Sequence, residues 1–152
     1  MNTADVGRAP TRALRVLLVE DDDDHLFLIR RSLRDLAGVA VAVDVARTGE
    51  QALDRLRRGR VDSRALPELV LLDLRIPRLD GLAVLGRIRA DTVLRTLPVV
   101  VLTSSERDED REQALRLGAT WYVCKPIDGA RFRAEVQQVA ARWARAGGPA
   151  LA

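Results

Sequence analysis

Cysteine, aromatic residues and long apolar runs are all scarce in this sequence, and each scarcity excludes a class of protein. The 152 residues include one cysteine, Cys124, so the chain has no internal disulfide, and we expect a reducing, cytoplasmic location. No apolar run approaches the roughly 20 residues that span a bilayer, and residues 1–12 lack the apolar centre of a signal peptide. We therefore expect a globular protein that does not contact a membrane.

Lysine is also nearly absent, because arginine carries almost all of the positive charge. The 25 basic and 22 acidic residues give a net charge of +3, which by itself is compatible with nucleic-acid binding. The arginines are mixed with acids, however, and aromatic residues, at 3%, offer few rings to stack on bases. We expect a solvated arginine-rich surface without nucleic-acid contact, and a steep salt dependence of any DNA affinity would indicate otherwise.

Strand and helix patterns alternate five times along one domain, residues 13–146, between a flexible leader (1–12) and a disordered tail (147–152). The predicted strands are residues 14–19, 39–45, 69–72, 99–102 and 120–124. The predicted helices are residues 24–37, 48–58, 82–90, 106–117 and 129–146. Thr48 and Gln51 form a capping box at the start of the second helix, and Gly59 is expected to end it.

Four of these strands are continuous apolar runs, which is typical of strands covered on both faces. The second strand instead places Val41, Val43 and Val45 on one face. The alternation predicts an α/β protein of (βα)₅ type, with a doubly wound, five-stranded parallel sheet between two layers of helices. No internal repeat and no second domain is evident.

A different polar group follows each of the four apolar strands. Glu20 and Asp21 follow the first strand, Asp73 the third, Thr103 the fourth and Lys125 the fifth. Parallel strands bring their carboxyl ends to one edge, where open α/β sheets place their sites. Carboxylates, a hydroxyl and an ammonium gathered there suit a divalent metal ion and a phosphoryl group. Lys125 is the only lysine, which marks a position where a compact point charge is used instead of arginine.

The acidic residues each admit two interpretations. Asp73, directly after an apolar strand, is a plausible nucleophile that forms an aspartyl phosphate, or simply an acid that caps a loop. The negative charges of Glu20, Asp21 and Asp73 would repel one another unless Mg²⁺ neutralised them. The acidic residues 22–24 are explained by a favourable interaction with the dipole of the following helix. His25 has no histidine or cysteine at ligand spacing and is expected to be a surface residue.

The groups at the later strand ends are equally open to a structural explanation. The Thr103 hydroxyl would hydrogen-bond a phosphoryl oxygen, or it would cap the next helix, a role that Ser105 suits better. Lys125 would neutralise phosphoryl charge. Cys124 is expected to be a small buried apolar residue rather than a reactive thiol.

Four segments together resemble the receiver domain of bacterial two-component response regulators. They are VLLVEDD (16–22), LVLLDLRIPRLDG (69–81), VVVLTSS (99–105) and WYVCKPI (121–127). The resemblance implies a flavodoxin-like fold with strand order 2-1-3-4-5. Within the family, the Glu-Asp pair and the long fourth-strand segment resemble stand-alone regulators paired with bacterial phytochrome kinases.

The resemblance also implies a role for each candidate residue. Asp73 would accept phosphate from a sensor histidine kinase, and Mg²⁺ would be held by Glu20, Asp21, Asp73 and the backbone carbonyl of Arg75. Thr103 matches the switch hydroxyl and Lys125 the phosphate-binding lysine, in a Lys125–Pro126 bond expected to be cis. Tyr122 matches the rotating aromatic residue. Ser104 departs from the family pattern, which often has Ala or Gly there, and we hypothesise that its bulk limits access of water to the phosphoryl group.

The predicted function is that of a single-domain response regulator, which signals through protein contacts and is not an enzyme beyond its own phosphorylation and dephosphorylation. The face made by the fourth helix, the fifth strand and the fifth helix would form a homodimer. Its aromatic residues, Trp121, Phe132 and Trp143, are expected to be mostly core. Two alternatives remain: a pseudo-receiver that binds a partner without phosphorylation, and a phosphohydrolase, which usually needs a second acid where this chain has Arg75.

Overall fold

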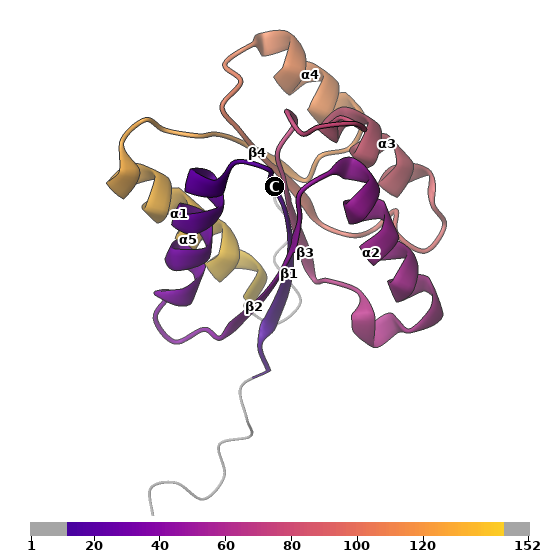
Figure 1. Ribbon diagram of the computed structural model, residues 1–152, viewed down its shortest axis with the longest axis horizontal. Coiled ribbons are helices and arrows are strands. Elements are labelled where there is room, and N and C mark those ends of the chain that lie inside the picture. Colours follow the sequence, from indigo (N-terminus) through magenta and orange to yellow (C-terminus); the bar gives the residue numbers. More distant parts are fainter. Residues whose placement is uncertain (1–11, 145–152) are drawn as a thin grey trace, which may run out of the picture.

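Strands and helices alternate along the whole of the described chain, residues 12–144, in a computed structural model (Figure 1). The strands are β1 (Leu14–Val19), β2 (Val41–Ala46), β3 (Leu69–Leu72), β4 (Val99–Thr103) and β5 (Trp121–Cys124). The helices are α1 (Asp23–Arg34), α2 (Gly49–Val61), α3 (Gly81–Ala90), α4 (Asp108–Arg116) and α5 (Gly129–Ala144), with a 3₁₀ turn η1 (Ser63–Ala65). The predicted tail and nearly all of the predicted leader lie outside the described residues.

The strands form one parallel sheet in the order β2-β1-β3-β4-β5, which confirms the predicted fold class and strand order. Helices α1 and α5 cover one face of the sheet, and α2, α3 and α4 cover the other (Figure 1). Successive side chains of a strand point to opposite faces of the sheet, so the side chains on both faces of each central strand are buried. The apolar runs in the sequence therefore serve two separate cores.

Alternate residues along each central strand belong to different cores. Leu17 and Val70 belong to the core under α2, α3 and α4. Val16 and Leu69 belong to the core under α1 and α5. Strand β2, at the edge of the sheet, alternates half-buried and exposed residues, as the pattern at Val41, Val43 and Val45 predicted.

Several element boundaries differ from the prediction for identifiable reasons. Helix α2 continues through Gly59 to Val61. Gly59 is there for close packing rather than as a stop, because a Cβ atom at this position would lie 2.2 Å from the Leu66 side chain. Helix α1 ends at Arg34, with Asp35 as its C-cap, three residues before the predicted end.

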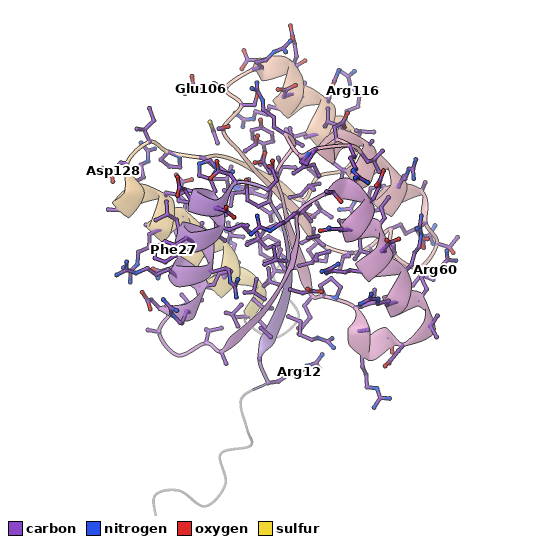
Figure 2. The ribbon with its side chains drawn as sticks, viewed as in Figure 1. Arg12, Phe27, Arg60, Glu106, Arg116 and Asp128 are labelled. Carbon is purple, nitrogen blue, oxygen red and sulfur yellow. The ribbon has the colours of Figure 1, made fainter. Side chains whose placement is uncertain are left out.

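The start of α2 follows its predicted capping chemistry. The Thr48 hydroxyl accepts a hydrogen bond from Gln51 N at 3.1 Å, and the Gln51 side chain accepts one from Arg47 N at 2.8 Å. Arginine side chains such as Arg60 and Arg116 project from the outer faces of the helices (Figure 2). Within residues 12–144, no helix has the length and apolar character needed to cross a membrane.

Candidate functional site

Four of the sequence-predicted residues meet at the carboxyl edge of the sheet, and all four are buried. Relative exposures are 1% for Glu20, 5% for Asp73, 0% for Thr103 and 9% for Lys125. Backbone hydrogen bonds extend the sheet one residue past the strands: Asp73 N donates to Val19 O at 3.0 Å, and Lys125 N donates to Thr103 O at 2.7 Å. The strand ladder thus fixes the relative positions of these side chains.

The ammonium group of Lys125 is the centre of the site. Its Nζ atom lies 2.6 Å from Glu20 Oε2, 2.9 Å from Asp73 Oδ2 and 3.0 Å from His25 Nδ1. An ammonium has three N–H donors and no acceptor, so these three partners use all of its hydrogen-bonding capacity. The Lys125–Pro126 bond is trans, because the described residues contain no cis peptide bond; the cis prediction is wrong, in line with the intrinsic trans preference of about 0.5–1 kcal/mol.

Two buried carboxylates therefore share a single cation. Burial and, second to it, the neighbouring charge of Asp73 raise the pKa of Glu20 from 4.5 to about 7, against the opposing effect of Lys125. Burial makes each charge costly unless it is paired. The pair of carboxylates carries one more negative charge than Lys125 neutralises, which is the condition that a bound divalent cation would relieve.

His25 belongs to this site, and its prediction as a surface residue is wrong. Its side chain is 36% exposed, but the ring nitrogen Nδ1 points inward and lies 3.7 Å from Glu20 Oε1. One ligand atom from each of Glu20, His25 and Asp73 lies within 4.8 Å of the others, a spacing compatible with a metal ion. Sequence spacing missed His25 because its partners come from distant strand ends, although a histidine in the first turn after an acidic strand end is a usable signal.

The loop after β3 holds the Asp73 carboxylate in place. Its second oxygen, Oδ1, accepts a hydrogen bond from Arg75 N at 3.0 Å. Gly81 starts α3 directly against this loop, because a Cβ atom there would lie 2.4 Å from Asp73 O and 2.6 Å from Leu74 Cα. The Asp21 side chain is exposed and lies outside the group of close ligand atoms, so its role and that of the Arg75 carbonyl stay predictions.

The loop after β4 carries the predicted switch residues. Thr103 Oγ1 accepts a hydrogen bond from Ser105 N at 3.3 Å, and the Ser104 side chain is exposed beside it. The prediction that Ser105 caps α4 is wrong: Arg107 is the N-cap, and the Ser105 hydroxyl instead donates to Asp110 at 2.5 Å. The Ser105 hydroxyl is bonded to Asp110 in the first turn of α4, and it does not occupy the N-cap position.

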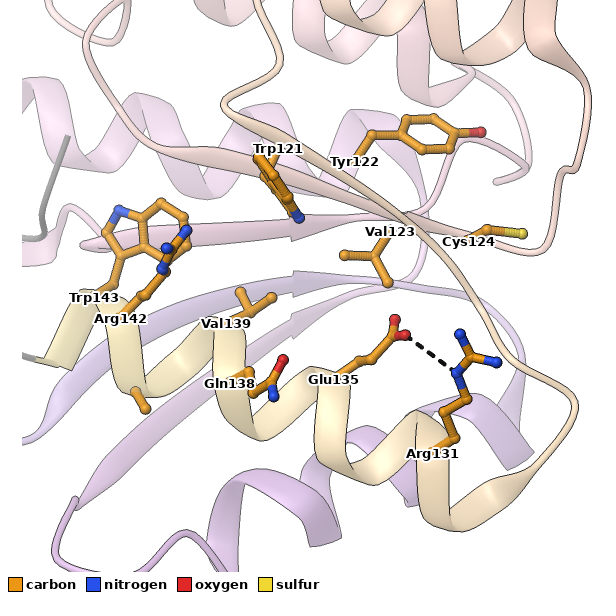
Figure 3. Close-up of a pocket in the computed structure, with 11 residues that line it drawn as sticks. Trp121, Tyr122, Val123, Cys124, Arg131, Glu135, Gln138, Val139, Arg142 and Trp143 are labelled. Atoms are coloured by element: carbon orange, nitrogen blue, oxygen red, sulfur yellow. Dashed lines mark ion pairs between the residues drawn. The ribbon is translucent and has the colours of Figure 1, made fainter. Parts of the chain in front are cut away.

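Strand β5 connects this loop to the edge of the molecule. Tyr122 donates from its hydroxyl to Ser105 O at 3.2 Å and points away from α5, whereas Val123 points toward it (Figure 3). Cys124 is exposed, contrary to prediction, because it is the last residue of an edge strand; its thiol lies on the Tyr122 side of β5, 3.6 Å from Ser105 O. Partial burial raises the pKa of its thiol, which keeps it protonated near neutral pH.

A groove of about 930 Å³ runs between β5 and α5 and is lined by both elements (Figure 3). Phe132 and Trp143 are buried in the core, as predicted, with exposures of 3% and 9%. Trp121 differs, since 44% of its surface is exposed along the groove. This face thus presents an exposed aromatic side chain at the start of β5, the strand whose other end lies beside Thr103.

Known proteins with this arrangement are similar over nearly the whole chain. Probable methanogenesis regulatory protein FilR2 of Methanothrix harundinacea is 41% identical over 138 residues, which are 89% of this chain and 88% of that protein. The phosphorylated cyanobacterial phytochrome response regulator RcpA superposes with a TM-score of 0.81 at 30% identity, over 88% of this chain and 96% of that one. The Mn²⁺-bound response regulator Rcp1 has a TM-score of 0.80 at 29% identity, over 91% and 99%.

The similarity to RcpA agrees with the resemblance to phytochrome-associated regulators seen in the sequence. The family profile described as Response regulator receiver domain matches residues 16–137, a span that runs from β1 into α5 and includes each of the strand-end residues described above. With the strand order, the buried carboxylates and the bridging lysine all in place, this chain belongs to the response regulator receiver family.

Proposed function

We propose that this protein is a response regulator in which Asp73 accepts a phosphoryl group from the phosphohistidine of a sensor histidine kinase. The observation that carries the proposal is the buried bridge from Lys125 Nζ to both Asp73 and Glu20, at 2.9 and 2.6 Å. Such a bridge orients the Asp73 carboxylate at the carboxyl edge of the sheet. A carboxylate held in this way is a nucleophile able to form an acyl phosphate.

The residues at the edge fit a divalent cation, which we propose to be Mg²⁺. Two buried carboxylates against one ammonium leave an uncompensated negative charge, and hard cations prefer carboxylate oxygens. Glu20 and Asp73 would hold the ion, with Asp21 and the Arg75 carbonyl as the further proposed ligands. When bound, the ion supplies charge neutralisation for the transferring phosphoryl group.

The chain's own residues divide the transfer between them. An Asp73 oxygen forms the new bond to phosphorus while the nitrogen–phosphorus bond of the kinase histidine breaks, and the imidazole leaves with the electron pair of that bond. Lys125 neutralises charge on the phosphoryl oxygens, and Arg75 N holds the second Asp73 oxygen, as it does now at 3.0 Å. Thr103 then donates its hydroxyl to a phosphoryl oxygen.

The proposed output is a change of the face formed by α4, β5 and α5. Tyr122 bonds the Ser105 carbonyl, two residues beyond Thr103, so a shift of the Thr103 hydroxyl is transmitted directly to β5. We propose that this face forms a homodimer and that the kinase is of the phytochrome class, as the likeness to RcpA suggests. We further propose a cytoplasmic protein without enzymatic activity on other substrates.

Intact-protein mass after incubation with Mg²⁺ and acetyl phosphate tests the central step, with Asp73→Asn as the matched control. We expect wild type to gain one phosphate and the variant to gain none. No gain in either protein would contradict phosphorylation and favour a pseudo-receiver that binds its partner without phosphate. The kinase class is tested separately, by phosphotransfer from purified phytochrome kinase against a kinase of another sensor class.

A further inference from the structure

His25 places a nitrogen donor inside the acidic site. Its Nδ1 atom lies 3.0 Å from Lys125 Nζ and 3.7 Å from Glu20 Oε1. Because an ammonium only donates, Nδ1 accepts this hydrogen bond, and its lone pair therefore points into the site while the ring proton is on Nε2. The ring also packs against buried Phe132 of α5, with centroids 6.4 Å apart, which fixes its orientation.

The positively charged ammonium of Lys125 lies among the oxygen and nitrogen atoms that would bind a metal ion. The Lys125 ammonium is within 2.6 to 3.0 Å of Glu20 Oε2, Asp73 Oδ2 and His25 Nδ1 together. These three residues are also the ones whose ligand atoms lie within 4.8 Å of one another. The site is thus prearranged for positive charge with two oxygen donors and one nitrogen donor, rather than with oxygen alone.

We propose that His25 Nδ1 is a ligand of the divalent cation, and that this donor set favours transition-metal ions such as Mn²⁺ and Co²⁺ over Mg²⁺. The inference rests on the proposed function, because it concerns the same cation. Mg²⁺ strongly prefers oxygen ligands, whereas imidazole nitrogen suits first-row transition metals. His25 Nδ1, Glu20 and Asp73 would together hold the ion, and Lys125 would stay paired with Asp73.

Two substitutions at position 25 separate a ligand from a merely supporting residue. His25→Leu removes the donor while keeping an apolar side chain against Phe132, and His25→Asp replaces nitrogen by oxygen. We expect the ratio of Mg²⁺ to Mn²⁺ dissociation constants, measured by titration calorimetry, to fall about tenfold in both variants. Asp24→Asn, which alters an exposed acid of the same helix turn, is the control and should leave the ratio unchanged.

Pulsed electron paramagnetic resonance of the Mn²⁺-loaded protein reads the ligand directly. We expect nitrogen-14 modulation in wild type and in Asp24→Asn, and its loss in His25→Leu. A wild-type spectrum without nitrogen coupling, or an equal metal ratio in wild type and His25→Leu, would overturn the inference. If wild type still gains a phosphate from acetyl phosphate with Mg²⁺, that failure leaves the proposed function intact; nitrogen coupling without any mass gain would refute the function instead.

Discussion

Glu20 is a buried carboxylate whose ionisation costs folding stability, although the proposed metal ligand is the ionised form. Its carboxylate is 1% exposed, and burial with the nearby charge of Asp73 raises its pKa to about 7. A group whose pKa is higher in the folded state than in the unfolded chain favours folding most below the unfolded value. That contribution is lost as pH rises from 4.5 to about 7.

The first prediction is therefore a pH profile of stability. In metal-free buffer, we expect the Glu20 contribution to lower the free energy of unfolding between pH 4.5 and 7, by about 3 kcal/mol at most. Urea unfolding followed by circular dichroism at several pH values measures it. Glu20→Gln, which cannot ionise, should flatten this part of the profile; an unchanged slope in that variant would contradict the prediction.

The second residue-scale prediction concerns Ser104, which is exposed beside the buried Thr103. Its hydroxymethyl group would hinder water that attacks the phosphoryl group on Asp73. We expect Ser104→Ala to lose phosphate about threefold faster than wild type, which corresponds to about 0.6 kcal/mol in the barrier. The decay is followed by intact mass after the phosphodonor is removed. Equal decay rates would refute a role for Ser104 in limiting water access.

The residues of the site differ in how far the sequence could predict them. Glu20, Asp73, Thr103 and Lys125 were predictable because each follows a strand that the apolar pattern identifies, and parallel strands must end at a common edge. His25 was not, since its contacts depend on how α1 leaves β1 and packs against α5. Side-chain contacts across the sheet edge are set by tertiary packing, which spacing along the chain does not report.

At the level of elements, the start of α3 determines where the loop that carries Asp73 can lie. A side chain at Gly81 would lie 2.4 Å from Asp73 O and 2.6 Å from Leu74 Cα, both of them backbone atoms that have no room to move. Gly86, one turn and a half later in the same helix, has no heavy atom closer than Leu117 Cδ2 at 4.0 Å. A side chain is therefore excluded at Gly81, whereas there is room for one at Gly86.

Alanine substitution should distinguish these two glycines. We expect Gly81→Ala to lower the free energy of unfolding by about 2 kcal/mol and to slow phosphorylation of Asp73 by acetyl phosphate, because the loop must shift. Gly86→Ala should raise stability by about 0.5–1 kcal/mol, since alanine loses less backbone entropy in a helix, with phosphorylation unchanged. Similar effects in both variants would show that the close approach at Gly81 is not what matters.

The elements themselves followed from the sequence better than their ends did. Apolar runs and capping residues gave all five strands and five helices within residues 12–144, whereas Gly59 was misread as a stop. A glycine looks the same in sequence whether it ends a helix or makes room for Leu66. The exposure of Trp121 and Cys124 also needed the structure, because only the observed strand order shows that β5 is an edge of the sheet.

For the molecule as a whole, strand β5 connects the candidate site at the sheet edge to the exposed face beside α5. Strand β5 is an edge of the sheet, and Lys125 is the residue directly after it. The candidate site and the exposed face with Trp121 are therefore joined by one strand. Trp121 leaves 44% of its surface exposed on the groove between β5 and α5. An exposed tryptophan that lines a groove is the kind of side chain that anchors a protein interface.

The last prediction is that Trp121 anchors a homodimer. We expect Trp121→Arg to weaken self-association at least tenfold, about 1.4 kcal/mol, measured by sedimentation velocity with and without acetyl phosphate and Mg²⁺. Val61→Arg is the control for charge: Val61 is 93% exposed at the end of α2, on the opposite layer of helices, so the same added positive charge there should leave association unaltered. Equal weakening by both variants would point to charge repulsion alone, and no weakening by Trp121→Arg would place any dimer on another face. If only the phosphorylated protein associates, and only through Trp121, then the bond from Tyr122 to Ser105 is the physical route by which the sheet edge controls assembly.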